Sequence, residues 1–454
     1  MHFVLCVILS EVKRSRRISK ASENVNYYED SSTSPDGYAQ NDILVVSAQS
    51  NYDLTKRRIK MDFTYLKQFM DRVVGTRTPG CAVEVRVKGE KVFTHASGYS
   101  DIEKLTPLTG NETVQLYSCT KPATVTAALQ LLERGLYTVT DPLYDYIPEF
   151  KDMYVKQPDG SVKPAENHIK IRDLFSMGAG FNYDLNSPGI QKAKELTDGR
   201  MDTATVIRCL AEQPLEYEPG TRYWYSLGHD VLAHFVEVVS GMKFSEYMAK
   251  NIFEPLEMKS TTFHPDEKIL SRMSALHRFV PDGETDIQAF EVAQMGNIDR
   301  DGSCEKVPLN NVYKLGPEYE SGGAGLVSDM EDYSKFTAML TNKGLGINGE
   351  RILCEKTVDL MRTNLLNENQ LKNFRESIAM SGYGYGYGVR TMMNPEIVGS
   401  ITTSDFGWSG AAGSIMISDP ESELSVFFLQ HCLALRQGFF LPRLRNVVYA
   451  GLGR

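Results

Sequence analysis

Hydrophobic positions near the start of the chain change from helical spacing to strand-like alternation. Apolar residues between positions 60 and 74 recur at nearly helical intervals, which predicts an opening helix. Residues 81–87 alternate between apolar and polar side chains, Lys88-Gly89-Glu90 is a turn sequence, and residues 91–96 alternate again more weakly. This order predicts a β-hairpin, with which a sheet begins.

The pattern is mostly helical from about residue 114 to residue 325, where turn signals separate the helical stretches. Strand patterns return only near the end of the chain, over residues 383–390, 413–418 and 424–429. A last helix is predicted over residues 442–449, with its proline in the first turn, where a missing N–H is tolerated.

Strand patterns at both ends of the chain predict an α/β (α+β) fold with an antiparallel sheet flanked by helices. We expect the sheet to be assembled from residues 58–112 and 331–454, with the mostly helical residues 113–330 inserted between them. Residues 1–57 are rich in polar residues without a period, so they are expected to form a poorly ordered tail or linker.

The composition is that of a globular protein whose ligand is a small molecule. The 454 residues are 42% hydrophobic and 24% charged, which argues against a disordered chain. The 49 basic and 58 acidic side chains give a net charge of −9, and the basic residues are scattered outside one short N-terminal cluster. A nucleic-acid groove needs concentrated basic residues, so no nucleic-acid partner is expected.

Cysteines and histidines do not indicate a metal site or a disulfide framework. The seven cysteines are widely spread without a Cys-x-x-Cys pair, and no His-Glu-x-x-His motif occurs. We therefore expect no metal and no cofactor. The apolar run of residues 3–9 is too short to cross a membrane, and its flanking charges are unlike those of a signal peptide. A cytoplasmic protein is the expectation, with an exported form left open and no indication of the oligomeric state.

The first candidate for chemistry is the Ser-x-x-Lys sequence Ser118-Cys119-Thr120-Lys121. Pro122 and the helical spacing that follows it place Ser118 at a helix N-terminus. Residues three apart share a helix face, so the Lys121 amine can reach the Ser118 hydroxyl and take its proton if burial lowers the lysine pKa. The alternative interpretation is a helix-capping serine followed by a solvated lysine.

Two further segments carry groups that could assist such a serine. Tyr225 directly precedes a predicted amphipathic helix, where a phenol could relay a proton. Small residues between positions 406 and 413 lead into a strand, whose edge could offer an N–H to an oxyanion. A packed aromatic cluster and a glycine-rich turn are the respective alternatives.

Together the sequences Ser118-x-x-Lys121, Tyr225-Ser-Leu227 and Trp408-Ser-Gly410 resemble the serine β-lactamase and DD-peptidase superfamily. The similarity is to the branch that contains class C β-lactamases and family VIII carboxylesterases, and it extends over residues 60–452. The resemblance implies that Ser118 is the acylated nucleophile and that Lys121 and Tyr225 share the roles of base and acid. It also implies an oxyanion hole made of the N–H groups of Ser118 and Ala411.

Two positions depart from the β-lactamase pattern and bear on the substrate. Leu227 stands where an asparagine would hold the acyl side chain, and Trp408 stands where a lysine would help to bind a carboxylate. A tryptophan at the position of Trp408 also occurs among family VIII esterases. The resemblance thus implies a serine carboxylesterase for small esters, with Trp408, Ser409, Gly410 and Leu227 at the substrate. The alternatives are a β-lactamase, a D-amino-acid peptidase or acyltransferase of the same superfamily, and a catalytically silent binding scaffold.

Overall fold

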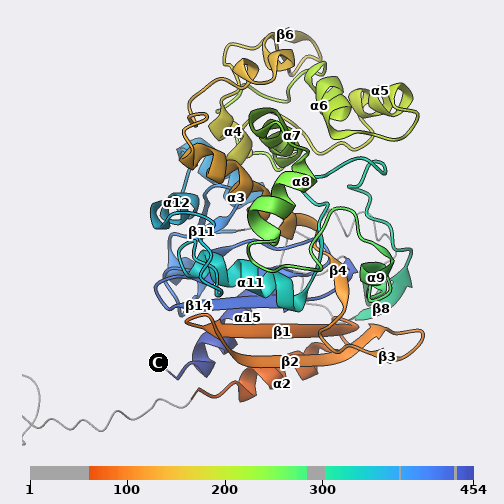
Figure 1. Cartoon of the computed structure of the whole chain (residues 1–454), viewed down its shortest axis with the longest axis vertical. Coiled ribbons are helices and arrows are strands. Elements are labelled where there is room, and N and C mark those ends of the chain that lie inside the picture. The colour runs from red at the N-terminus through yellow and green to blue at the C-terminus, as the bar shows by residue number, and fades with distance from the viewer. Residues whose placement is uncertain (1–60, 284–301, 378–379, 434–436, 454) are drawn as a thin grey trace, which may run out of the picture. The chain divides into compact units, whose positions relative to one another are not determined.

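A computed structural model describes residues 61–283, 302–377, 380–433 and 437–453 of the chain (Figure 1). The described residues belong to the unit Arg58–Arg454. The predicted tail over residues 1–57 lies outside the described residues. No helix in the described ranges is both long enough and apolar enough to cross a membrane.

The strands of the described part are β1 (Gly80–Val87), β2 (Glu90–Asp101), β3 (Thr106–Pro107), β4 (Thr113–Gln115), β5 (Tyr154–Lys156), β6 (Val162–Pro164), β7 (Leu276–Pro281), β8 (Gly302–Val307), β9 (Val327–Asp329), β10 (Tyr383–Tyr385), β11 (Arg390–Met392), β12 (Phe406–Gly407), β13 (Ile415–Asp419), β14 (Leu424–Leu429) and β15 (Cys432–Leu433).

The α-helices of the described part are α2 (Thr64–Val73), α3 (Thr120–Glu133), α4 (Ile171–Phe175), α5 (Pro188–Leu196), α6 (Thr203–Ala211), α7 (Gly228–Ser240), α8 (Phe244–Met248), α9 (Glu267–Leu270), α11 (Met330–Thr341), α12 (Glu355–Met361), α13 (Glu368–Ser377), α14 (Pro395–Val398) and α15 (Gln437–Gly451). Three short 3-10 helices, η1 (Tyr117–Cys119), η2 (Leu143–Asp145) and η3 (Pro148–Phe150), and one π-helical turn, η4 (Ala249–Phe253), complete the helical elements of these ranges.

The main sheet combines the two ends of the chain, as the strand patterns predicted. Its strand order is β10-β11-β12-β13-β14-β1-β2-β3, and every pairing is antiparallel. The N-terminal hairpin meets the C-terminal strands where β1 pairs with β14, with Ala82 opposite Leu429. The prediction of an antiparallel sheet with an inserted helical region is confirmed.

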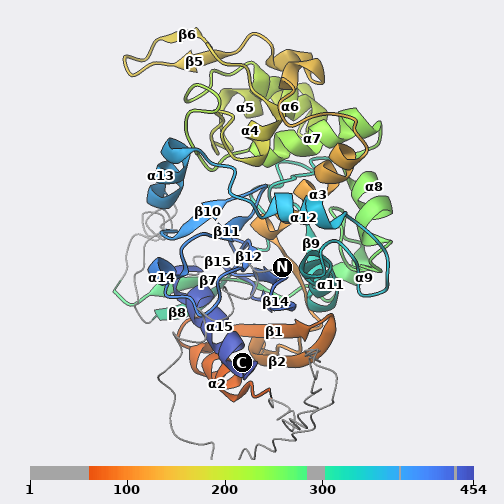
Figure 2. The same ribbon diagram turned by 90° about the vertical axis from the view of Figure 1, so that its left-hand side faces the viewer.

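Helices cover both faces of this sheet. Helices α2 and α15 pack on one face, where they enclose alternate apolar residues of the central strands such as Val83, Val85 and Val426. Helix α11 packs on the other face against Phe427 of β14. Figures 1 and 2 place the inserted helices α5 and α6 and the β5–β6 hairpin at the end opposite to β1 and β2.

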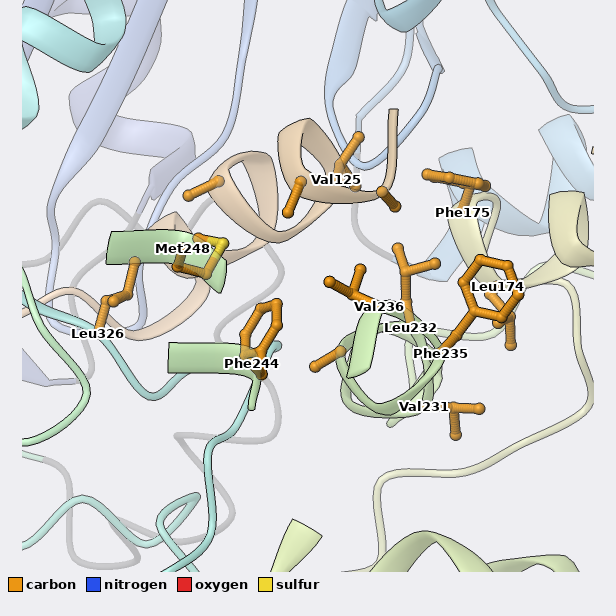
Figure 3. Close-up of a cluster of buried hydrophobic side chains, with 14 of the residues drawn as sticks. Val125, Leu174, Phe175, Val231, Leu232, Phe235, Val236, Phe244, Met248 and Leu326 are labelled. Atoms are coloured by element: carbon orange, nitrogen blue, oxygen red, sulfur yellow. The ribbon is translucent and has the colours of Figure 1, made fainter. Parts of the chain in front are cut away.

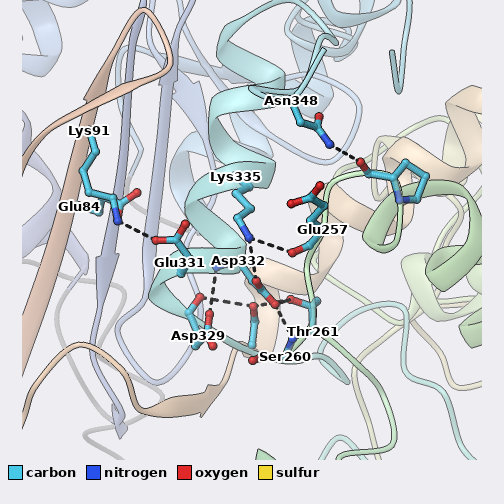
Figure 4. Close-up of polar contacts among 12 residues, drawn as sticks. Glu84, Lys91, Glu257, Ser260, Thr261, Asp329, Glu331, Asp332, Lys335 and Asn348 are labelled. Atoms are coloured by element: carbon cyan, nitrogen blue, oxygen red, sulfur yellow. Dashed lines mark hydrogen bonds and ion pairs between the residues drawn. The ribbon is translucent and has the colours of Figure 1, made fainter. Parts of the chain in front are cut away.

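Polar positions of β1 face α11 rather than solvent. Glu84 and Arg86 are both buried and form an ion pair with a 2.6 Å separation between Arg86 Nε and Glu84 Oε1. Lys91 joins the Glu84 carboxylate to Glu331 at the start of α11, with Nζ to oxygen distances of 2.8 and 2.7 Å (Figure 4). The polar residues of β1 therefore form ion pairs on the face toward α11, and its apolar residues pack on the opposite face.

An apolar cluster fixes the two helices that carry the candidate chemistry. Val125 of α3 lies in the same buried cluster as Leu232 and Val236 of α7 and Phe175 of α4 (Figure 3). Burial of such side chains contributes about 1.5–3 kcal/mol each relative to exposure. The starts of α3 and α7 are thereby held in fixed positions relative to each other.

Residues 383–390 do not form the single strand that their Gly/Tyr alternation predicted. They form β10, a tight turn in which the Gly386 N–H donates to the Val389 carbonyl at 2.8 Å, and the first residue of β11. A Cβ on Gly386 would lie 2.2 Å from the Met361 carbonyl oxygen, and Gly388 has a φ of +69°. These glycines serve close packing and a left-handed turn, which the alternation could not reveal.

The structure adds two further details that the sequence patterns did not predict. Strand pairing occurs within the region predicted to be mostly helical, where β7 pairs with β8 and with β15 in a separate three-stranded sheet. The last helix begins at Gln437, so Pro442 lies inside it and not in its first turn. Phe440 and Leu441 are buried in the cluster under the sheet, so tertiary packing extends the helix before the proline.

Candidate active site

Ser118 lies in η1, which leads directly into α3, so the predicted position at a helix N-terminus is confirmed. The residue before it, Tyr117, has a φ of +48°, a left-handed conformation that is costly for an aromatic residue. A Cβ on Gly410 would lie 2.2 Å from the Leu116 carbonyl oxygen. The bare backbone of the 408–410 segment therefore packs directly on the chain that presents the serine.

Lys121 is fully buried one turn after Ser118. Its Nζ donates to Ser118 Oγ at 3.3 Å and to the Gly323 carbonyl at 2.8 Å. Burial lowers the pKa of Lys121 to about 7, against an opposing effect of the Asp230 charge. A solvated lysine, the alternative left open by the sequence, does not describe this side chain.

Tyr225 approaches the same serine from the loop before α7. Its hydroxyl donates to Ser118 Oγ at 2.8 Å and accepts from the indole Nε1 of Trp408 at 3.2 Å. The Tyr225 and Trp408 rings are stacked with centroids 5.9 Å apart. Burial raises the pKa of Tyr225 above its ordinary value. Burial therefore favours the neutral phenol.

Ala411 lies in the turn between β12 and β13, which is closed by a 2.8 Å hydrogen bond from the Gly410 N–H to the Ser414 carbonyl. In the part of the chain that the structure describes, the N–H groups of Ser118 and Ala411 donate to no backbone carbonyl of a turn, loop or helix cap. Both residues are only half-buried. That these two N–H groups form an oxyanion hole remains a prediction.

The other predicted substrate residues differ in how they are placed. Trp408 is 6% exposed and stacks beside Tyr225, and the buried Ser409 hydroxyl has no hydrogen-bond partner among the described residues. Leu227 is 3% exposed and packs in the apolar cluster between the helices. A contact of its side chain with substrate remains a prediction.

Three residues around Lys121 had no role in the sequence-based analysis. Tyr183 stacks on Tyr225 with ring centroids 5.7 Å apart, and Lys121 Nζ lies 5.6 Å from the Tyr183 centroid. Gly323 supplies the carbonyl that accepts from Lys121. Asp230 is a carboxylate on the buried face of α7. Of these three residues, only Asp230 could have been noticed in the sequence, because it is an acidic residue among the apolar positions of an amphipathic helix.

Two arginines could in principle replace the missing lysine of the β-lactamase pattern. Arg390 is fully buried and pairs with Asp405, with 3.3 Å between nitrogen and oxygen. Arg222 is exposed. The buried Arg390 charge therefore pairs with a carboxylate of the protein itself.

Fold and site geometry together define a serine hydrolase fold of the β-lactamase and DD-peptidase type. The sequence model of the family described as Beta-lactamase matches residues 64–444, and the chain belongs to this family. The resemblance noted in the sequence is thus confirmed. Members of this superfamily are serine hydrolases that work through an acyl-enzyme.

Relatives and solved structures agree with this assignment. Protein Rv1367c of Mycobacterium tuberculosis is 26% identical over 346 residues, which cover 74% of this chain and 81% of the relative. The structure of EstCE1, described as a hydrolase with promiscuous acyltransferase activity, has a TM-score of 0.66, 24% identity, and coverage of 85% of this chain and 96% of its own. Simvastatin synthase (LovD) from Aspergillus terreus has a TM-score of 0.68, 20% identity, and coverage of 86% and 98%. Both structures share the fold.

Proposed function

We propose that this protein is a serine carboxylesterase that acts on small, uncharged esters through an acyl-enzyme on Ser118. The observation that supports it most is the convergence of Lys121 Nζ and Tyr225 Oη on Ser118 Oγ, at 3.3 and 2.8 Å. A nucleophile within reach of a base, with that base oriented by a further group, is the general arrangement for covalent catalysis. The Gly323 carbonyl orients Lys121 in this arrangement.

In the proposed reaction, Ser118 Oγ attacks the ester carbonyl while its proton passes to the neutral Lys121 amine, directly or through Tyr225. The oxyanion accepts hydrogen bonds from the N–H groups of Ser118 and Ala411. The C–O bond to the alcohol then breaks, and the alcohol leaves with the proton returned by Tyr225 or Lys121. Water attacks the acyl-enzyme by the same proton path and releases the carboxylic acid and free Ser118.

Trp408 supports an ester over an anionic lactam. Its indole N–H is engaged by Tyr225, and its ring presents an apolar surface where the β-lactamase pattern has a cation. Loss of one charged hydrogen bond to a substrate carboxylate is worth about 1.5–3 kcal/mol, or roughly one to two decades in binding. The description of EstCE1 as a hydrolase agrees with this proposal.

The substrate preference can be measured directly. We expect kcat/KM for p-nitrophenyl butyrate to exceed that for nitrocefin by at least about tenfold. Trp408→Lys should shift this ratio toward nitrocefin by about tenfold, because it restores a cation for the carboxylate. Trp408→Phe is the control, since it keeps an aromatic ring and adds no charge. A wild-type protein that prefers nitrocefin would contradict the proposal.

The buried lysine also sets the expected pH dependence. Lys121 must be neutral to accept the serine proton, and its pKa of about 7 means that it becomes protonated as the pH falls below neutrality. We expect kcat/KM for p-nitrophenyl butyrate to fall about tenfold per pH unit below an acid limb centred near pH 7. Circular dichroism over the same range would exclude unfolding as the cause. Undiminished activity at pH 5 would contradict a lysine base.

A further inference from the structure

Asp230 is a buried carboxylate on the face of α7 that looks toward Lys121. It is fully buried, and its Oδ1 accepts hydrogen bonds from Ser321 Oγ at 2.6 Å and Tyr319 Oη at 3.0 Å. Its Oδ2 has no hydrogen-bond partner among the described residues. Burying a carboxylate oxygen without a hydrogen-bond partner costs folding free energy. A positive charge nearby would offset this cost.

Gly323 lies beside both this carboxylate oxygen and the amine of Lys121. A Cβ on Gly323 would lie 2.7 Å from Asp230 Oδ2 and 3.3 Å from Lys121 Nζ. No side chain fits there, and the carbonyl of the same glycine accepts from Lys121 at 2.8 Å. The carboxylate oxygen and the amine therefore both border the space that a side chain on Gly323 would occupy.

The other titratable groups around the pair carry no charge at neutral pH. Burial raises the pKa values of Tyr183, Tyr225 and Tyr319, and it raises the pKa of Cys119 to about 12. Burial, with a contribution from the Lys121 charge, lowers the pKa of His229 to about 3. Asp230 is thus the negative group that faces Lys121 within the described residues.

Asp230 has the surroundings of an anion. Burial raises its pKa, while the Ser321 hydroxyl, the charge of Lys121 and the Tyr319 hydroxyl act to lower it. Each of these groups favours the charged carboxylate over the neutral acid. The same charge opposes the effect of burial on Lys121.

We propose that Asp230 is a positioning residue that holds Lys121 against the Gly323 carbonyl and stabilises the lysine when it carries the proton of Ser118. The inference rests on the proposed role of Lys121 as the base. A lysine buried without a facing carboxylate would be a weaker base, because burial disfavours its charged form. Asp230 would thus keep the pKa of Lys121 close to the working pH, where a general base is most effective.

The test compares pH profiles of the full-length wild-type protein and Asp230→Asn. Two rates are followed between pH 5 and 9, kcat/KM for p-nitrophenyl butyrate and the labelling of Ser118 by a fluorophosphonate probe, mapped by mass spectrometry. We expect the acid limb of both profiles to move to lower pH by about one unit in Asp230→Asn, and the plateau to fall about three- to tenfold. Asp230→Glu keeps the charge and should return the limb toward its wild-type position.

Asp332→Asn is a matched control, because Asp332 is another buried carboxylate with protein donors. It lies on α11, where it accepts from the Ser260 N–H at 2.5 Å and the Thr261 hydroxyl at 3.3 Å (Figure 4). This control should lose stability without a shift of the acid limb. Tyr319→Phe removes one donor to Asp230 and should give a smaller shift in the same direction, even if Asp230→Asn does not fold.

Each outcome decides a specific point. An unmoved limb in both Asp230→Asn and Tyr319→Phe, or an equal shift in Asp332→Asn, would overturn the role of Asp230. A wild-type protein that is labelled on Ser118 but hydrolyses no ester would contradict the proposed substrate alone, and the labelling profiles would still decide the role of Asp230. A wild-type protein that is not labelled at any pH would overturn both.

Discussion

Ser118→Ala is expected to lower kcat/KM for p-nitrophenyl butyrate by at least about 10⁴-fold, to the level of the uncatalysed reaction with bound substrate. Removal of Oγ leaves Lys121 and Tyr225 in place without a group that can form the acyl-enzyme. The substitution deletes a single oxygen from a half-buried position, so the fold should persist. Steady-state turnover and the loss of the fluorophosphonate adduct would be measured together.

A neighbouring serine gives the matched control for this variant. Ser226 is 1% exposed, follows Tyr225, and its hydroxyl contacts the Met177 sulfur at 3.7 Å. Ser226→Ala should retain both turnover and labelling of Ser118. If folded wild-type protein formed no adduct on Ser118, the catalytically silent scaffold would replace the enzyme as the better explanation.

Lys121→Met is expected to lower kcat for the same ester by about 10²–10⁴-fold, the usual contribution of a general base. Methionine has nearly the length of lysine and carries no charge, so it suits a position that is fully buried. Thermal unfolding should occur somewhat below the wild-type temperature, since the substitution removes the amine that faces the buried Asp230 carboxylate. The residual activity should also lose the acid limb near pH 7.

Lys335→Met controls for the loss of a lysine that donates to a backbone carbonyl. Lys335 lies on α11, and its Nζ donates to the Glu257 carbonyl at 2.8 Å (Figure 4). Its replacement should leave the rate and the pH profile unchanged. Activity above one tenth of wild type in Lys121→Met would assign the proton transfer to another group.

Much of the fold could be predicted because its strands have local patterns. The hairpin of β1 and β2 and the strand β14 follow from alternation and turn residues within single segments. That the two ends of the chain share one sheet was inferred only from the presence of strands at both ends, and the direct pairing of β1 with β14 was not predicted. The β7–β8 pairing was missed, because two short, half-polar strands give no clear alternation and are specified by their neighbours.

The candidate site was predictable to the extent that its residues are close in sequence or match a known pattern. Ser118 and Lys121 are three positions apart in the sequence, so helical geometry alone suggests their contact. Tyr225 and Trp408 were selected through the resemblance, since no local pattern places them beside a serine more than a hundred residues away. The strained Tyr117 and the facing of Asp230 and Lys121 depend on tertiary packing, which a linear sequence does not display.

The position of β1 between β2 and β14 has a consequence for how this protein is made. Residues that pair directly across these two strands, such as Ala82 and Leu429, are separated by about 350 residues of chain. Closing a loop of this length costs entropy before any pairing is gained, and such long-range contacts slow folding. The hairpin of β1 and β2 leaves the ribosome early and must wait with one edge uncovered until β14 has been synthesised. We therefore expect this strand order to favour aggregation during synthesis. Chaperones that shield the uncovered edge would counteract it.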